Sequence, residues 1–222
     1  MVDFPSTTFV NRLLPKDKFI EHLDLSPILK KKLGTDIVHI RVLNKFSNSV
    51  LNFNDLPETE KDSKEEIIKE VLLLQIELKK HDFDSKLIEA IAKQNSHKLV
   101  FLLRFEKYAK LALYYQRLYE LKWKPFEDLS LVLIGKNMNE VWLSFVRQIA
   151  NGDEIDVLTE TITKNELDNK LEIQNRLEVL QKEITRLDTA IRKERQPRKK
   201  YELHQKLLEL EESYQKLGDN NG

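Results

Sequence analysis

The chain has no cysteine, and its 222 residues include only 5 glycines. Without cysteine there is no disulfide, no thiol nucleophile and no cysteine-ligated zinc or iron–sulfur site, which agrees with a reducing compartment. So few glycines argue against a Gly-rich phosphate-binding loop. No run approaches the ~18 consecutive apolar residues of a membrane span, and the first residues lack the features of a signal peptide. We therefore expect a soluble, cytoplasmic protein.

Neither sign of charge is in excess, and no metal-ligand spacing is present. The 37 basic and 37 acidic residues give a formal net charge of zero, so attraction to a charged partner must come from a local cluster. We expect no cofactor, except Mg²⁺ if the protein is the nuclease considered below. The histidines are not spaced like metal ligands and lie at His22, His39, His81, His97 and His204.

In the first two thirds of the chain, alternation of apolar and polar residues predicts strands, and apolar residues that recur every three or four positions predict amphipathic helices. Ser26 and Pro27 are typical of a helix start, and Gly34 of a helix end. The stretch EVLLLQIELKK contains good helix formers, but its even positions from Leu72 to Leu78 are apolar, which favours a strand. The expected helices are 15–23, 26–33, 84–94 and 138–150. The expected strands are 36–43, 49–54, 68–79, 98–105, 108–116, 118–123 and 129–135, the first two forming a hairpin.

The last third of the chain carries a coiled-coil pattern, because apolar residues recur there with alternating gaps of four and three. Pro197 interrupts the pattern once, so two helices most simply fold back as an antiparallel hairpin; alternatively, they pair with a second chain. The fold class is α+β, with a mixed sheet of six or seven strands and flanking helices in residues 1–155, followed by a coiled-coil helical hairpin in residues 156–222. The apolar positions are Ile173, Leu177, Leu180, Ile184, Leu187, Ile191, Leu203, Leu207, Leu210, Tyr214 and Leu217.

The interruption of the coiled coil, RKERQPRKK, is the strongest charge cluster in the sequence. In a hairpin it would form the tip, where several cations could bind a phosphate backbone or an acidic protein surface. Alternatively, it is a solvated loop whose basic residues interact with a helix C-terminus. No aromatic residue lies within the cluster, so stacking on single-stranded nucleic acid is not indicated. The candidate binding residues are Arg192, Lys193, Arg195, Arg198, Lys199 and Lys200.

Glu77 and Lys79 lie two residues apart on the expected strand 68–79, so both face the same side of a sheet. A strand with this pair resembles the PD-(D/E)xK nucleases, in which a further acidic residue completes a Mg²⁺ site. Asp55, which follows the expected strand 49–54, is the candidate for that third residue. The motif is short, and such a pair is also typical of a solvent-facing sheet surface with a weak ion pair.

The chain also resembles a prokaryotic family catalogued as domain of unknown function 4391. The resemblance rests on Leu14-Pro15-Lys16, Asp36-Ile37, Leu72 to Lys79, Ala90 to Gln94 and Val100-Phe101-Leu102. It covers about residues 5–150 and the C-terminal helices. It implies no activity, but such proteins are often encoded beside restriction-type methyltransferases and superfamily 2 helicases.

These observations favour a non-catalytic accessory or scaffold subunit of a bacterial antiphage or restriction-like DNA-targeting complex. Its helical arm would bind a larger partner, such as a helicase or methyltransferase, or DNA. The alternative is a Mg²⁺-dependent nuclease, active or degenerate, that uses Asp55, Glu77 and Lys79. A third interpretation is a homodimer formed through the coiled coil.

Overall fold

The structure is a computed structural model that describes residues 4–21, 23–53, 67–152 and 163–219. It divides into two compact units, Met1–Ile162 and Thr163–Gly222, which we call the body and the arm. The boundary expected from the sequence, between residues 155 and 156, lies outside the described residues. In the described parts, no helix is both long and apolar enough to cross a membrane.

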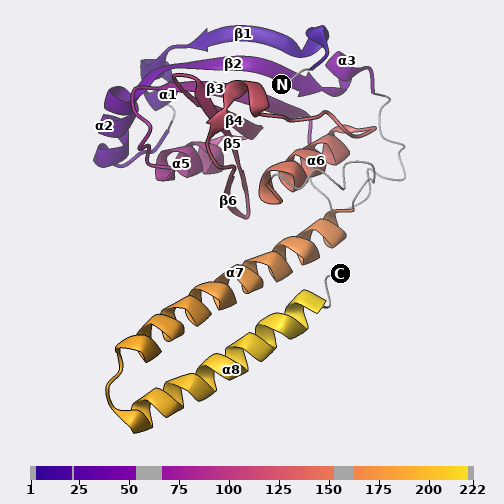
Figure 1. The fold of residues 1–222 in the computed structure, drawn as a ribbon. Helices are drawn as coiled ribbons and strands as arrows, with labels where there is room; N and C mark the ends of the chain where they lie inside the picture. The colour runs from indigo at the N-terminus through magenta and orange to yellow at the C-terminus, as the bar shows by residue number, and fades with distance from the viewer. Residues whose placement is uncertain (1–3, 22, 54–66, 153–162, 220–222) are drawn as a thin grey trace. The chain divides into compact units, whose positions relative to one another are not determined.

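The body is built on a seven-stranded mixed sheet (Figure 1). The strands follow the order β1-β2-β3-β4-β5-β6, and β7 pairs with β5. Strands β3 and β4 are parallel and are connected through a helix, whereas the other pairs are antiparallel. The strands are β1 (Phe9–Leu14), β2 (Ile37–Ser47), β3 (Glu70–Leu78), β4 (Lys98–Phe105), β5 (Tyr108–Tyr115), β6 (Arg117–Glu120) and β7 (Lys124–Pro125).

Helices pack against both faces of this sheet. Even-numbered residues of β3, such as Ile76, join the core that contains Leu33 of α2 and Ile88 of α5. Phe46 of β2 instead contacts Phe145 of α6, so α6 packs on the opposite face. The helical elements of the body are η1 (Ser6–Thr8), α1 (Lys16–Glu21), α2 (Pro27–Asp36), α3 (Asn48–Leu51), α5 (Lys86–Gln94), η2 (Phe126–Asp128) and α6 (Met138–Ala150).

The α+β class, the mixed sheet and the C-terminal hairpin are confirmed, and so is the strand assignment of EVLLLQIEL, which forms β3. The strand expected at 49–54 is wrong, because residues 48–51 form the helical turn α3 and Asn52 has a left-handed backbone. The antiparallel partners of β2 are β1 and β3. Strand β1 was not predicted, since five of its six residues are exposed and its sequence carries no alternation.

Two further sequence predictions are wrong. Residues 129–135 form no strand apart from an isolated bridge at Leu131, although Leu129 and Leu131 are both buried. Burial therefore alternates there without a continuous ladder of hydrogen bonds. Helix α2 does not end at Gly34 but continues to Asp36. It runs directly into β2, so no left-handed turn that requires glycine separates the two elements.

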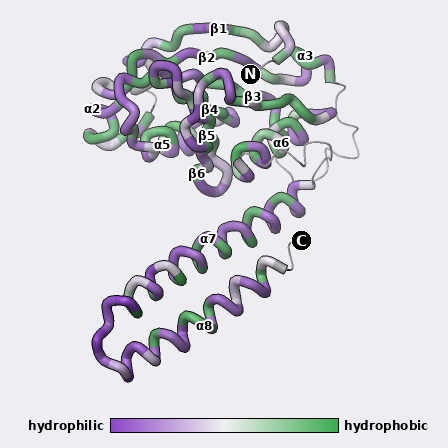
Figure 2. The backbone as a smooth tube through the Cα atoms, viewed as in Figure 1, coloured by the Kyte–Doolittle hydropathy of each residue, from purple (hydrophilic) through white to green (hydrophobic). Residues whose placement is uncertain are grey.

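The arm consists of α7 (Lys164–Lys193) and α8 (Pro197–Asp219), which pack as an antiparallel hairpin (Figure 1). Most residues of both helices are hydrophilic, and apolar residues recur among them at intervals (Figure 2). The predicted apolar positions are all buried or half-buried, with Ile191 and Leu207 the most buried among them. The hairpin therefore closes its apolar seam within one chain.

A capping box begins the arm. The Thr163 backbone N–H and hydroxyl donate to the Glu166 carboxylate at 2.9 and 2.7 Å, and the Glu166 N–H donates to the Thr163 hydroxyl at 3.4 Å. These bonds hold the pKa of Glu166 below its usual value, with the bond from the Thr163 N–H as the largest cause. They satisfy N-terminal groups that would otherwise lack helical partners.

Candidate functional site

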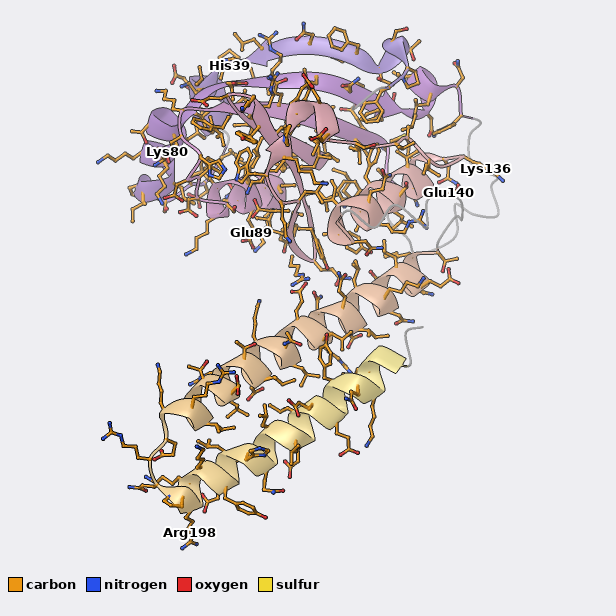
Figure 3. The ribbon with its side chains drawn as sticks, viewed as in Figure 1. His39, Lys80, Glu89, Lys136, Glu140 and Arg198 are labelled. Atoms are coloured by element: carbon orange, nitrogen blue, oxygen red, sulfur yellow. The ribbon has the colours of Figure 1, made fainter. Side chains whose placement is uncertain are left out.

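The tip of the arm, Arg192–Lys200, concentrates positive charge. Its six basic side chains and single carboxylate, Glu194, give a net charge of +5, and because the whole chain is neutral the remaining residues sum to −5. All six basic residues predicted from the sequence are exposed here. Figure 3 shows Arg198 at the end of the arm, directed outward.

Internal ion pairs use little of this charge. Arg192 contacts Asp188 at 2.7 Å and Arg198 contacts Glu202 at 3.4 Å, each within its own helix and with arginine side chains that are 76% and 93% exposed. The other four basic residues of the tip form no ion pair with any residue that the structure describes. Exposed pairs of this kind contribute only about 0–1 kcal/mol. A partner carboxylate can therefore replace them at little cost.

Hydrogen bonds order the connection between the two helices. The Glu194 N–H donates to the Ala190 carbonyl at 2.9 Å, and the Gln196 N–H donates to the Glu194 carboxylate at 2.8 Å. The hydrogen bond from Gln196 is the main cause that lowers the pKa of Glu194, and the nearby Lys199 lowers it further. Pro197 then occupies the first turn of α8, where it needs no N–H partner. The turn between α7 and α8 is therefore short, and hydrogen bonds hold Glu194 and Gln196 in place.

Sequence reasoning missed two exposed apolar residues on α8, one next to the tip and one near the middle of the helix. Tyr201 and Leu208 lie seven residues apart on α8 and are 66% and 47% exposed. Two helical turns separate them, so both lie on one side of the helix, outside the apolar seam. Tyrosine and arginine are enriched among residues that dominate protein–protein binding energy. The signal available in the sequence was two apolar residues, seven positions apart, that fall outside the coiled-coil repeat.

Glu77 and Lys79 differ in burial and in hydrogen bonding. Glu77 lies on the central strand β3, is half-buried and accepts a long 3.4 Å hydrogen bond from the Gln75 amide. Lys79 is exposed one residue after β3, and its backbone N–H donates to the Asp36 carbonyl at 2.8 Å. The two side chains form no ion pair in the described structure, so the weak pair expected of a sheet surface is not formed.

Asp55, the third candidate, lies outside the described residues. The strand expected to precede it is the helical turn α3, so the reason for placing it beside Glu77 no longer holds. Within the described ranges, no group of three or more His, Asp and Glu side chains could hold a metal ion. In the described part of the body, Glu77 therefore does not have two further carboxylate or histidine side chains beside it with which to bind a metal ion.

A pocket of about 320 Å³ lies at the C-terminal end of α5 and is lined by Lys93, His97 and Tyr114 among other residues. Its basic side chains are already engaged. Lys93 contacts Glu89 at 2.6 Å and lies over the Tyr114 ring, and His97 lies 3.7 Å from Glu70. The pocket therefore offers less free charge than the tip.

Comparison with known proteins identifies a family and no function. The chain matches the family model described as "Domain of unknown function (DUF4391)" over residues 2–213. No curated protein and no solved structure matches it.

Proposed function

The chain belongs to the DUF4391 family, a domain of unknown function, and from its own side chains we propose that it is a non-catalytic accessory subunit whose arm binds a larger protein. The observation that carries this proposal is the cluster of six exposed basic residues at the tip in an otherwise acidic remainder of the chain. The proposed partner is a helicase or methyltransferase of a bacterial antiphage or restriction-like DNA-targeting complex. This setting is the one that the family resemblance implies.

The shape of the arm supports a role in contacting another molecule. Helix α7 has 30 residues and is therefore about 45 Å long. Its seam is closed by α8, so the surface left for a partner is the tip and the outer faces of the helices. A cationic tip attracts an acidic partner surface over distances up to about the Debye length, ~8 Å at physiological ionic strength, and speeds association.

We favour a protein partner over DNA because exposed apolar side chains follow the basic cluster along α8. Tyr201 directly follows the basic cluster and Leu208 lies two turns further along the helix. Protein interfaces combine a small apolar or aromatic centre with a polar, charged rim. A phosphate backbone would use the cations but would leave Leu208 without an apolar contact. DNA binding by the tip is the competing outcome in the test below.

Changing Arg195, Arg198 and Lys199 to Glu should reduce partner binding by about a hundredfold or more, because attraction becomes repulsion at three positions. The full-length protein would be captured from its own cells, in extract treated with nuclease to remove bridging nucleic acid. We expect a protein to copurify in stoichiometric amount with the wild type and to be absent with the variant.

The matched control changes three exposed lysines of α7 away from the tip, Lys164, Lys170 and Lys182, to Glu. It alters the net charge equally and should retain the partner. Equal retention by the tip variant would contradict the proposal. If the wild type captures no protein but binds labelled duplex DNA through the same three residues, the tip is a nucleic-acid site instead.

A further inference from the structure

A row of polar side chains crosses the three central strands of the body. In the observed register, His39 of β2 is opposite Glu77 of β3, and Glu77 is beside Arg104 of β4. One step along the same face, Arg41 is opposite Gln75. Directly paired residues on neighbouring strands project to the same side of a sheet. We call these five residues the polar row.

The polar row lies on the face against which α6 packs, at the end that is away from α6. Towards α6, the same face carries Phe46, Val71 and Val100, and all three are fully buried. The members of the polar row are instead half-buried. Figure 3 shows His39 at the end of β2 that lies away from α6. Central strands therefore present charged side chains here that solvent and a ligand can reach.

The cations of the polar row are not neutralised by carboxylates. Arg41 donates to the side-chain and backbone oxygens of Asn11 at 2.8 and 3.4 Å. The Arg104 guanidinium lies 4.4 Å from the centre of the Phe126 ring, and its Nε is buried without a hydrogen-bond partner. Neither arginine forms an ion pair with Glu77 or with any other described residue.

Three other partly buried cations of the body each pair with a carboxylate. Lys110 contacts Glu120 at 2.9 Å, Lys32 contacts Asp84 at 2.6 Å, and Lys45 pairs with Glu70. A half-buried charge is normally paired because burial without a partner is costly. Two guanidinium groups without a carboxylate partner, on the same face of the sheet and on either side of β3, therefore point to an anion that is supplied from outside the chain.

We propose that the polar row binds phosphate groups through Arg41 and Arg104. A guanidinium group presents a planar fork of donors that matches phosphate oxygens in pairs. The contact with the Phe126 ring restrains the Arg104 guanidinium, and because Nε is buried a phosphate would be held by the terminal Nη donors. The two arginines flank β3 and are offset by two residues along it, so their backbones lie about 12 Å apart, two strand spacings across the sheet and two residues along it. Their side chains can hold neighbouring phosphates of a nucleotide polyphosphate or of a nucleic-acid strand.

Substitution of Glu77 distinguishes phosphate binding from a metal-dependent catalytic site. Glu77 lies directly beside Arg104 and one position along the same face from Arg41. Its carboxylate repels an anion, so Glu77→Gln should tighten phosphate binding severalfold. A residue that ligated a catalytic metal would lose function on the same substitution. Lys79, exposed two residues further along, adds a third cation at this end of the strand.

The test measures binding of a fluorescein-labelled oligothymidylate to full-length protein by anisotropy. Arg195, Arg198 and Lys199 are changed to Gln in every sample so that the tip contributes little. Changing Arg41 or Arg104 to Gln should each weaken binding about tenfold, the worth of one charge-assisted contact, and flatten the salt dependence by about one phosphate contact. Circular dichroism verifies that each variant is folded.

The control is Lys30→Gln, because Lys30 is exposed on α2, which packs against the opposite face of the sheet. It should leave binding unchanged. Arg104→Lys, which keeps the charge and removes the fork, should bind with intermediate affinity. The proposal is overturned by affinities that neither arginine change alters, by loss of binding in Glu77→Gln, or by equally tight binding of polyglutamate.

Competition then identifies the source of the phosphate. Displacement of the oligonucleotide by ATP or inorganic phosphate at comparable concentrations assigns the polar row to a small phosphate-bearing ligand. Displacement only by unlabelled oligonucleotide assigns it to a nucleic-acid strand. Absence of binding by oligonucleotide, ATP and phosphate alike overturns the proposal.

Discussion

Replacing Leu207 by Asp should unfold the arm and leave the body folded. Leu207 is only 9% exposed in the seam between α7 and α8, so the substitution removes an apolar contact and places a carboxylate where it has no partner. Changes of this kind cost about 4 kcal/mol or more. Helices in water depend on packing of their apolar face, and the described part of the arm consists of these two helices. The destabilisation should therefore exceed the free energy of unfolding of the hairpin.

Circular dichroism and limited proteolysis measure the effect, as lost helix content and rapid cleavage within residues 163–219. Leu208→Asp is the matched control, since the neighbouring side chain is 47% exposed and should tolerate the charge. Because the hairpin closes within one chain, the molecular mass in solution should be the same in the wild type and the variant. A wild-type dimer that Leu207→Asp or Leu180→Asp converts to monomers would instead support the homodimer interpretation.

Phe145→Ala should destabilise the body by about 3–5 kcal/mol, the usual cost of removing a buried aromatic ring. Phe145 of α6 is fully buried and contacts Phe46 at 5.4 Å and Phe4 at 6.1 Å between ring centres, both edge to face. This cluster joins α6 and the N-terminal residues to the sheet. The loss is a large part of the ~5–15 kcal/mol that stabilises a typical domain.

Urea denaturation followed by tryptophan fluorescence measures this loss as a lower midpoint, because Trp142 lies in the same helix. Phe9→Ala is the control, since Phe9 on the edge strand β1 is 59% exposed and should cost well under 1 kcal/mol. A midpoint for Phe145→Ala that equals that of the control would contradict the packing of α6 described above.

The sequence predicts those elements whose local pattern agrees with their final environment. Strand β3 lies at the centre of the sheet, and its apolar even positions outweighed the helix propensity of its residues. The arm follows from the repeat alone, including the position of the basic tip. Strand β1 could not be found in this way, because it is an exposed edge strand whose place depends on pairing with β2.

The polar row could not be predicted from the sequence because it depends on register. Strand β2 has register shifts between Ile37 and His39 and between Val42 and Asn44, and each shift changes which residues share a face. Arg104 lies beside Glu77 because β3 and β4, which α5 connects, pair in parallel in this register. The Glu77–Lys79 spacing was visible in the sequence. Their different exposure and the pairing of Glu77 with Arg104 and of Gln75 with Arg41 were not.

The measurement that tests the account most directly is a DNA-cleavage assay with the purified protein in Mg²⁺ and in Mn²⁺, on single- and double-stranded DNA. Glu77→Ala and Lys79→Ala are assayed beside the wild type. The account holds that the protein binds and does not cut, so it predicts no metal-dependent cleavage by any of the three. Cleavage by the wild type that is lost in both variants would contradict it and would make β3 a catalytic strand.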